Sequence, residues 1–167
     1  MVEAALGSHC SVGVLYTRQS LGQSSFVREW EGEPAGTCYV PVLTLDAAIQ
    51  RFGKPYYCKI DVEGWELEVL SGLTAAIPLL SFEFHLHDEA VEQARLCMKR
   101  LLEFGPTEVN VVPAEGAAFG YADWVPLGKF LDQFPRAATE LLRGDSYGDL
   151  FVVNTGLVSQ SLVAPLH

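Results

Sequence analysis

Three polar side chains at the C-terminal ends of apolar runs are the strongest candidates for chemistry in this sequence. Asp61 lies near the end of the strand-like run 56–62, and Glu83 and His85 lie at the end of the next such run, 79–84. A carboxylate or an imidazole in such a position can take a proton as a general base, or orient a hydroxyl or amine of a ligand. In an open α/β sheet ligands bind outside the carboxyl ends of the strands, so we expect these side chains to converge on one edge of a sheet.

Each candidate also has a plainer explanation. An acidic residue at a helix start is stabilised by the helix dipole, but Glu63 and Glu66 suit that role better than Asp61, which is predicted inside the strand. We favour a functional Asp61, because a charge in an apolar run needs a compensating reason. Glu83 is equally well explained as a core carboxylate that pairs with Lys59 on the neighbouring strand.

A metal site is a weaker interpretation of the same residues. His85 and His87 stand two residues apart, but the other histidines are His9 and His167, so a full set of nitrogen ligands is missing. We therefore predict no metal. The alternative is an oxygen-rich magnesium or manganese site, with ligands Asp61, Glu83 and His85.

Other signals for a bound cofactor are few. None of the 15 glycines forms a G-x-G-x-x-G motif or a P-loop, so no phosphate or nucleoside cradle is recognisable. Trp65 and Trp124 could stack on the ring of a ligand, although large aromatic side chains more often serve packing.

The elements that must position these residues alternate between strand and helix. The run 56–62 is rich in strand formers, and Glu63-Gly64 ends it before a helical pattern begins. The right-handed crossover rule then places the strand 79–84 parallel to it in one sheet. Expected strands are 2–6, 12–16, 37–42, 56–62, 79–84, 108–112 and 150–154. Expected helices are 45–52, 65–73, 89–104, 127–134 and 137–142, with Thr44 and Asp88 as caps for the first and third.

This pattern predicts a single α/β domain with three parts. Residues 1–43 form a strand and a small antiparallel flap, residues 44–154 form the α/β core, and residues 155–167 form a loosely held tail. A chain of 167 residues is long enough to bury roughly 70% of the surface that it exposes when unfolded.

The composition limits which binding partners and which cellular compartment we expect for this protein. The 21 acidic and 11 basic residues give a net charge of −10, which argues against nucleic acid and anionic membranes as non-specific partners. The four cysteines are too widely spaced for a C-x-x-C pair, and we expect them to be reduced. Neither a signal peptide nor an apolar run of membrane-spanning length is present, so we expect a soluble, cytoplasmic protein.

The stretch 40–85 resembles the C-terminal half of FkbM-type methyltransferases. Three motifs of that family stand here in order: T-L-D at 44–46, K-I-D-x-E-G at 59–64 and E-x-H at 83–85. An A-L-G at 5–7, a serine pair at 24–25 and the strand G-D-L-F-V at 148–152 are similar to the family as well. The resemblance thus extends over nearly the whole chain.

The resemblance implies a Rossmann-like class I methyltransferase sheet that is incomplete at its N-terminal side, with the first expected strand as its third. It implies methyl transfer from S-adenosylmethionine to an oxygen or nitrogen of a small molecule or glycan. Asp61 would lie near the reacting methyl and bind the cofactor together with Glu63, and Glu83 and His85 would shape the acceptor pocket. We expect Asp61 to be the general base or the group that orients the acceptor, which makes Asp61, Glu83 and His85 the candidate catalytic residues. The cofactor loop of the family would precede Met1, so we expect this chain alone to bind S-adenosylmethionine poorly.

A non-catalytic function is the alternative to an enzymatic one. Without the neighbouring first strand, the strand 56–62 would have an open edge, and an unpaired edge is a template for association. The chain would then be a non-catalytic fragment or subunit that binds a second copy, or a missing N-terminal segment, through that edge. The acceptor's identity is expected to depend on the loops 19–30 and 114–125.

Overall fold

The structure is a computed structural model that describes residues 2–19, 23–30, 32–114 and 116–158. These residues form mixed α/β structure in two compact units. The first unit comprises residues 1–54 and 61–75, and the second comprises residues 55–60 and 76–167. Most of the predicted tail, residues 159–167, lies outside the described residues.

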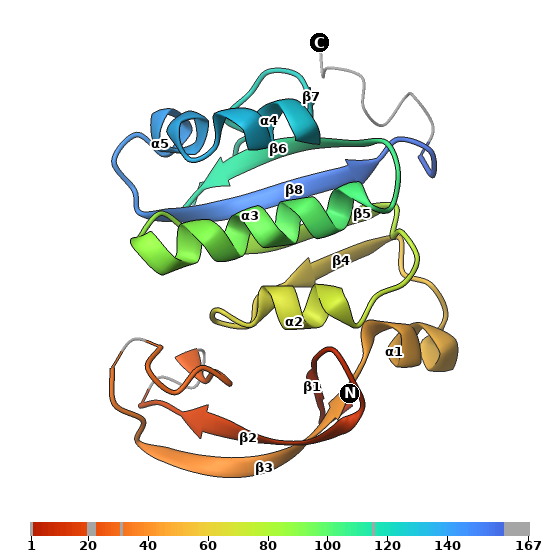
Figure 1. Cartoon of the computed structure of the whole chain (residues 1–167), viewed down its shortest axis with the longest axis vertical. Coiled ribbons are helices and arrows are strands. Elements are labelled where there is room, and N and C mark those ends of the chain that lie inside the picture. Colours follow the sequence, from red (N-terminus) through yellow and green to blue (C-terminus); the bar gives the residue numbers. More distant parts are fainter. Residues whose placement is uncertain (1, 20–22, 31, 115, 159–167) are drawn as a thin grey trace. The chain divides into compact units, whose positions relative to one another are not determined.

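The first unit contains a three-stranded sheet in the order β1-β3-β2 (Figure 1). Strand β2 (Ser11–Thr17) runs antiparallel to β3 (Gly36–Leu43), which confirms the predicted antiparallel flap. The short strand β1 (Ala5–Leu6) pairs with β3 in parallel. The flap therefore depends on pairing between segments that lie about twenty residues or more apart in the chain.

Two helices complete the first unit. Helix α1 (Leu45–Phe52) begins after Thr44, whose side-chain oxygen accepts a hydrogen bond from the Ala47 backbone N–H at 3.0 Å, so the predicted cap is confirmed. Helix α2 (Glu66–Ser71) is shorter than its predicted range 65–73. The Asp46 carboxylate of α1 accepts hydrogen bonds from the Thr74 N–H and hydroxyl, which ties α1 to the segment that follows α2.

The second unit contains a five-stranded sheet in the order β4-β5-β8-β6-β7. Strands β4 and β5 are parallel, as predicted, with Ile60 opposite Phe82. Strand β8 enters between β5 and β6 and runs antiparallel to both, and β7 is antiparallel to β6. The bounds are Tyr57–Ile60 (β4), Leu79–His85 (β5), Thr107–Pro113 (β6), Val125–Pro126 (β7) and Tyr147–Asn154 (β8).

The second sheet divides its residues between an apolar face and a polar face. In β5, Phe82 and Phe84 are almost fully buried and alternate with Glu83 and His85, because successive side chains of a strand point to opposite faces. The ring of Phe84 packs against Phe134, next to α4, so the apolar face is the one that the helices cover. These helices are α3 (Asp88–Leu102), α4 (Leu127–Gln133) and α5 (Arg136–Leu142), as Figure 1 shows.

Several predicted boundaries are wrong. Strand β4 ends at Ile60 rather than at residue 62, so Asp61 follows the strand and is exposed, and it does not interrupt an apolar interior. Helix α3 begins at Asp88 itself, with His87 in the cap position and no side-chain cap, so Asp88 is not the cap. Strand β7 was not predicted, and β8 begins at Tyr147 and not at residue 150, because Tyr147, Gly148 and Asp149 do not continue the apolar run.

No helix among the described residues is both long enough and apolar enough to cross a lipid bilayer.

Candidate functional site

The turn that carries Asp61 and Glu63 has an unusual backbone. Glu63 has a φ of 53° and Gly64 a φ of 88°, so two successive residues adopt the left-handed region that most side chains disfavour. Such a conformation persists only where surrounding contacts hold it in place.

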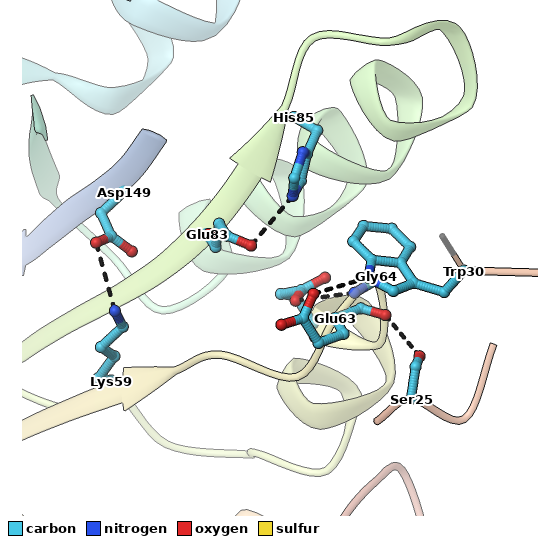
Figure 2. Close-up of polar contacts among 9 residues, drawn as sticks. Ser25, Trp30, Lys59, Glu63, Gly64, Glu83, His85 and Asp149 are labelled. Atoms are coloured by element: carbon cyan, nitrogen blue, oxygen red, sulfur yellow. Dashed lines mark hydrogen bonds and ion pairs between the residues drawn. The ribbon is translucent and has the colours of Figure 1, made fainter. Parts of the chain in front are cut away.

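Contacts from the N-terminal part of the first unit hold this turn. The Trp30 indole N–H donates to Glu63 Oε2 at 2.7 Å, and the Ser25 hydroxyl donates to the Glu63 carbonyl at 2.6 Å (Figure 2). The Gly64 N–H donates to Glu66 Oε1 at 3.2 Å. A Cβ atom on Gly64 would lie 2.6 Å from the Trp30 ring, so this position has room only for glycine. The turn is therefore anchored by buried Ser25 and by Trp30, and Asp61 is exposed beside it.

Glu83 and His85 form a direct pair on β5. Glu83 Oε2 and His85 Nε2 lie 3.1 Å apart, and both side chains are largely buried (Figure 2). Positions two apart in a strand share one face, which explains why the two side chains meet. A carboxylate beside an imidazole fixes the orientation of the ring and stabilises the imidazolium once the ring has taken a proton. The pair can therefore act as a proton acceptor.

The imidazole of His85 also lies in a row of rings. Its centroid is 5.6 Å from that of Tyr147, which is its register partner on β8, and 5.6 Å from that of His87. The ring of Tyr147 is inclined by only 25° to that of His85, close to a stacked arrangement. Tyr147 is thus a candidate site residue that the sequence did not indicate.

The alternative explanation of Glu83 is an ion pair with Lys59 on the neighbouring strand. In the structure, Lys59 Nζ lies 3.5 Å from Asp149 Oδ2, and Asp149 stands opposite Glu83 on β8 (Figure 2). Two acidic residues thus face each other across neighbouring strands, with Lys59 and His85 as their cationic or hydrogen-bonding partners.

The sequence candidates therefore fall into two groups. Asp61 and Glu63 share the anchored turn of the first unit, whereas Glu83 and His85 form the pair of the second unit. The tryptophans considered for stacking both have aromatic neighbours: Trp65 lies 5.5 Å from Phe26, and Trp124 lies 5.3 Å from Phe119, measured between ring centroids. Within the described ranges, no group of three or more His, Cys, Asp or Glu side chains is arranged as a metal site.

Sequence reasoning missed Trp30, Tyr147 and Asp149 as neighbours of the candidates. Trp30 lies 33 positions from Glu63, and the two β8 residues lie more than 60 positions from Glu83 and His85, so no local spacing could reveal them. The one usable signal was the G-D-L-F-V motif at 148–152, which identified the closing strand without its neighbours in the sheet.

Partial burial also affects two ionisable groups near these elements. Burial raises the pKa of the Cys58 thiol on β4, so less thiolate is present than for an exposed cysteine at the same pH. Burial and the nearby Glu140 carboxylate raise the pKa of the Tyr121 phenol, so it stays protonated at neutral pH.

Comparison with known families gives one match. Residues 2–106 match the family described as the methyltransferase FkbM domain, a range that includes Asp61, Glu63, Glu83 and His85. No curated protein and no solved structure matches the chain.

Proposed function

Because residues 2–106 show that the chain belongs to the FkbM methyltransferase family, we propose that it transfers a methyl group from S-adenosylmethionine to an oxygen or nitrogen of a small molecule or glycan. The parallel pairing of β4 and β5, with helices on one face of their sheet, supports a Rossmann-like arrangement for this activity. Methyl transfer needs an aligned acceptor and the removal of one proton from it.

The observation that carries this proposal is the contact of 3.1 Å between Glu83 and His85. In this mechanism His85 takes the proton from the acceptor hydroxyl or amine, and Glu83 orients the imidazole and stabilises its charged form. Both side chains are largely buried, which strengthens the electrostatic attraction between them. The role of the pair as catalytic residues is the first part of the proposal.

The residues of the anchored turn fit a cationic cofactor. When bound, S-adenosylmethionine supplies a methyl group on a positively charged sulfur. Asp61 and Glu63 provide two carboxylates within three residues, and opposite charge favours their contact with a cation. Glu63 is held by Trp30 through Oε2, and Asp61 is exposed, so Asp61 is the residue that we propose to reach the cofactor.

The proposal is tested by the release of S-adenosylhomocysteine from S-adenosylmethionine in the presence of hydroxylated and amine acceptors. His85→Asn removes the basic nitrogen and should lower kcat about a hundredfold or more, the usual contribution of a general base. Glu83→Gln should lower kcat less, because the imidazole is kept. His9→Asn changes an exposed histidine of the first unit and is the matched control. Unchanged kcat in His85→Asn would contradict the assignment.

A second function is favoured by the position of β4. This strand stands at the end of its sheet, and Tyr56 and Tyr57 are 51% and 42% exposed. We propose association of two copies of the chain through this edge as the alternative to catalysis. Sedimentation should show a concentration-dependent oligomer that Tyr56→Lys weakens. Phe52→Lys, at a similarly exposed aromatic residue of α1, should leave the oligomer intact.

A further inference from the structure

The second unit contains a hollow of about 790 Å³ at the edge of its sheet where β5 and β6 end and β8 begins. Its walls come from the end of β6 and the loop after it, residues 113–114 and 116–120, and from the end of α5 with the turn that leads to β8. Its volume lies within the range of pockets that hold small organic ligands. The hollow is separate from the Glu83–His85 contact and is not explained by it.

The loop that forms one wall is held in position by backbone contacts. The Gly116 N–H donates to the Pro113 carbonyl, and the Gly120 N–H donates to the Val111 carbonyl, both at 2.7 Å. At its far end, the buried Asn110 amide donates to the Tyr121 carbonyl and accepts from the Tyr121 N–H, each at 3.0 Å. The wall is therefore formed before a ligand arrives, which lowers the entropy cost of binding.

Aromatic and charged groups line the hollow. Phe119 is 45% exposed and is supported by Trp124 and Phe151, whose ring centroids lie 5.3 Å and 5.4 Å from its own. An aromatic ring held in this way presents a flat apolar surface to a ligand. Tyr147 adds a second ring to the lining.

Three charged side chains line the hollow, Glu140, Arg143 and Asp145, and an ion pair offsets the charge of the first. Glu140 is in an ion pair with Arg136 at 3.1 Å, whereas Arg143 and Asp145 make no side-chain hydrogen bond or ion pair with the residues that the structure describes. The two side chains offer one set of strong donors and one set of strong acceptors to a ligand. One charge of each sign favours neither an anionic nor a cationic ligand over a neutral one.

Tyr147 connects the hollow with the Glu83–His85 pair. Its ring lines the hollow and lies 5.6 Å from the ring of His85, which in turn contacts Glu83. A ligand seated against Tyr147 would therefore lie one ring away from the imidazole to which we assign the proton transfer.

From these contacts we infer that the hollow binds the methyl acceptor, and that the acceptor is a neutral, polyhydroxylated ring such as a sugar. The apolar face of such a ring stacks on Phe119, and its neighbouring hydroxyls, which both donate and accept, bind Arg143 and Asp145. That the bound ring is the methyl acceptor rests on the proposed function. The binding of the ring to the hollow does not depend on methyl transfer.

Saturation-transfer NMR on the full chain tests the binding without a methyl donor. The probes are the neutral methyl glycosides of glucose, galactose, mannose and rhamnose, with glucuronate and glucosamine as anionic and cationic comparisons. At least one neutral glycoside should bind, and more tightly than either charged sugar. Phe119→Ala and Asp145→Asn should each weaken its binding about fivefold or more. The controls Phe52→Ala and Asp132→Asn change exposed residues of other helices and should have no effect.

Asp145→Asn keeps the shape of an exposed side chain, so it stays informative if Phe119→Ala disturbs the fold. Tighter binding of a charged sugar, no glycoside binding, or equal binding by Asp145→Asn and Asp132→Asn would overturn the inference. Glycoside binding that depends on Phe119 and Asp145 without any methyl transfer would support the site and contradict the proposed function. Methyl transfer to another acceptor, unaffected by both substitutions, would support the function and overturn the site.

Discussion

Replacing Gly64 with alanine tests whether the turn after β4 is held as described. Gly64 has a φ of 88°, and its missing Cβ would lie 2.6 Å from the Trp30 ring. Trp30 cannot move aside freely, because its indole N–H donates to Glu63 Oε2 at 2.7 Å. The substitution therefore strains the backbone and also displaces a hydrogen-bonded ring.

The two costs can be added from general values. Placing a non-glycine residue in the left-handed region costs about 1–2 kcal/mol, and losing a hydrogen bond to a charged group costs about 1.5–3 kcal/mol. Gly64→Ala should thus lower the free energy of unfolding by about 2.5–5 kcal/mol in total. Gly105→Ala, at a φ of 106° with no atom within 4 Å of the added Cβ, should show the backbone cost without the displaced ring.

The assay is urea unfolding followed by circular dichroism, with Gly128→Ala as a second control. Gly128 lies in α4 with open space around it, so alanine there should stabilise the chain by about 0.5–1 kcal/mol. In a Trp30→Ala background the added cost of Gly64→Ala should fall to about 1–2 kcal/mol, because only the backbone strain is left. Equal losses for Gly64→Ala and Gly105→Ala in the parent chain would refute the reasoning.

Three further outcomes are expected. Asp61→Asn should lower kcat far more than it weakens acceptor binding. The control Asp132→Asn, on the surface of α4, should leave both unchanged. A change in kcat of less than about threefold for Asp61→Asn would contradict a role of Asp61 in the reaction. Chelation with EDTA should leave methyl transfer unchanged, and activity that disappears with EDTA and returns with magnesium would establish the mixed carboxylate site instead. Iodoacetamide at pH 8 should alkylate the exposed Cys10 and Cys38 before Cys58, because the raised pKa of Cys58 leaves less thiolate, and mass spectrometry of digests gives the order.

Local features of the chain were predictable because their causes lie within a few residues. Thr44 is followed by a helix whose third residue donates to its side chain, and this capping needs no distant partner. The parallel pairing of β4 with β5 followed from the length of the connection and the handedness rule. The end of β4 was misplaced by two residues because Asp61 and Val62 continue an acceptable strand composition, while the turn that stops the strand depends on Trp30 and Ser25.

The sequence by itself determined which residues carry the candidate chemistry. Asp61 and Glu63 are two positions apart in one turn, and Glu83 and His85 are two positions apart in one strand, so their proximity is a consequence of short-range geometry. Only the tertiary structure decided what surrounds them. Tyr147 and Asp149 stand beside His85 and Glu83 because β8, from the end of the chain, inserts between β5 and β6. That insertion depends on the pairing of distant strands with one another, which spacing along the chain does not specify.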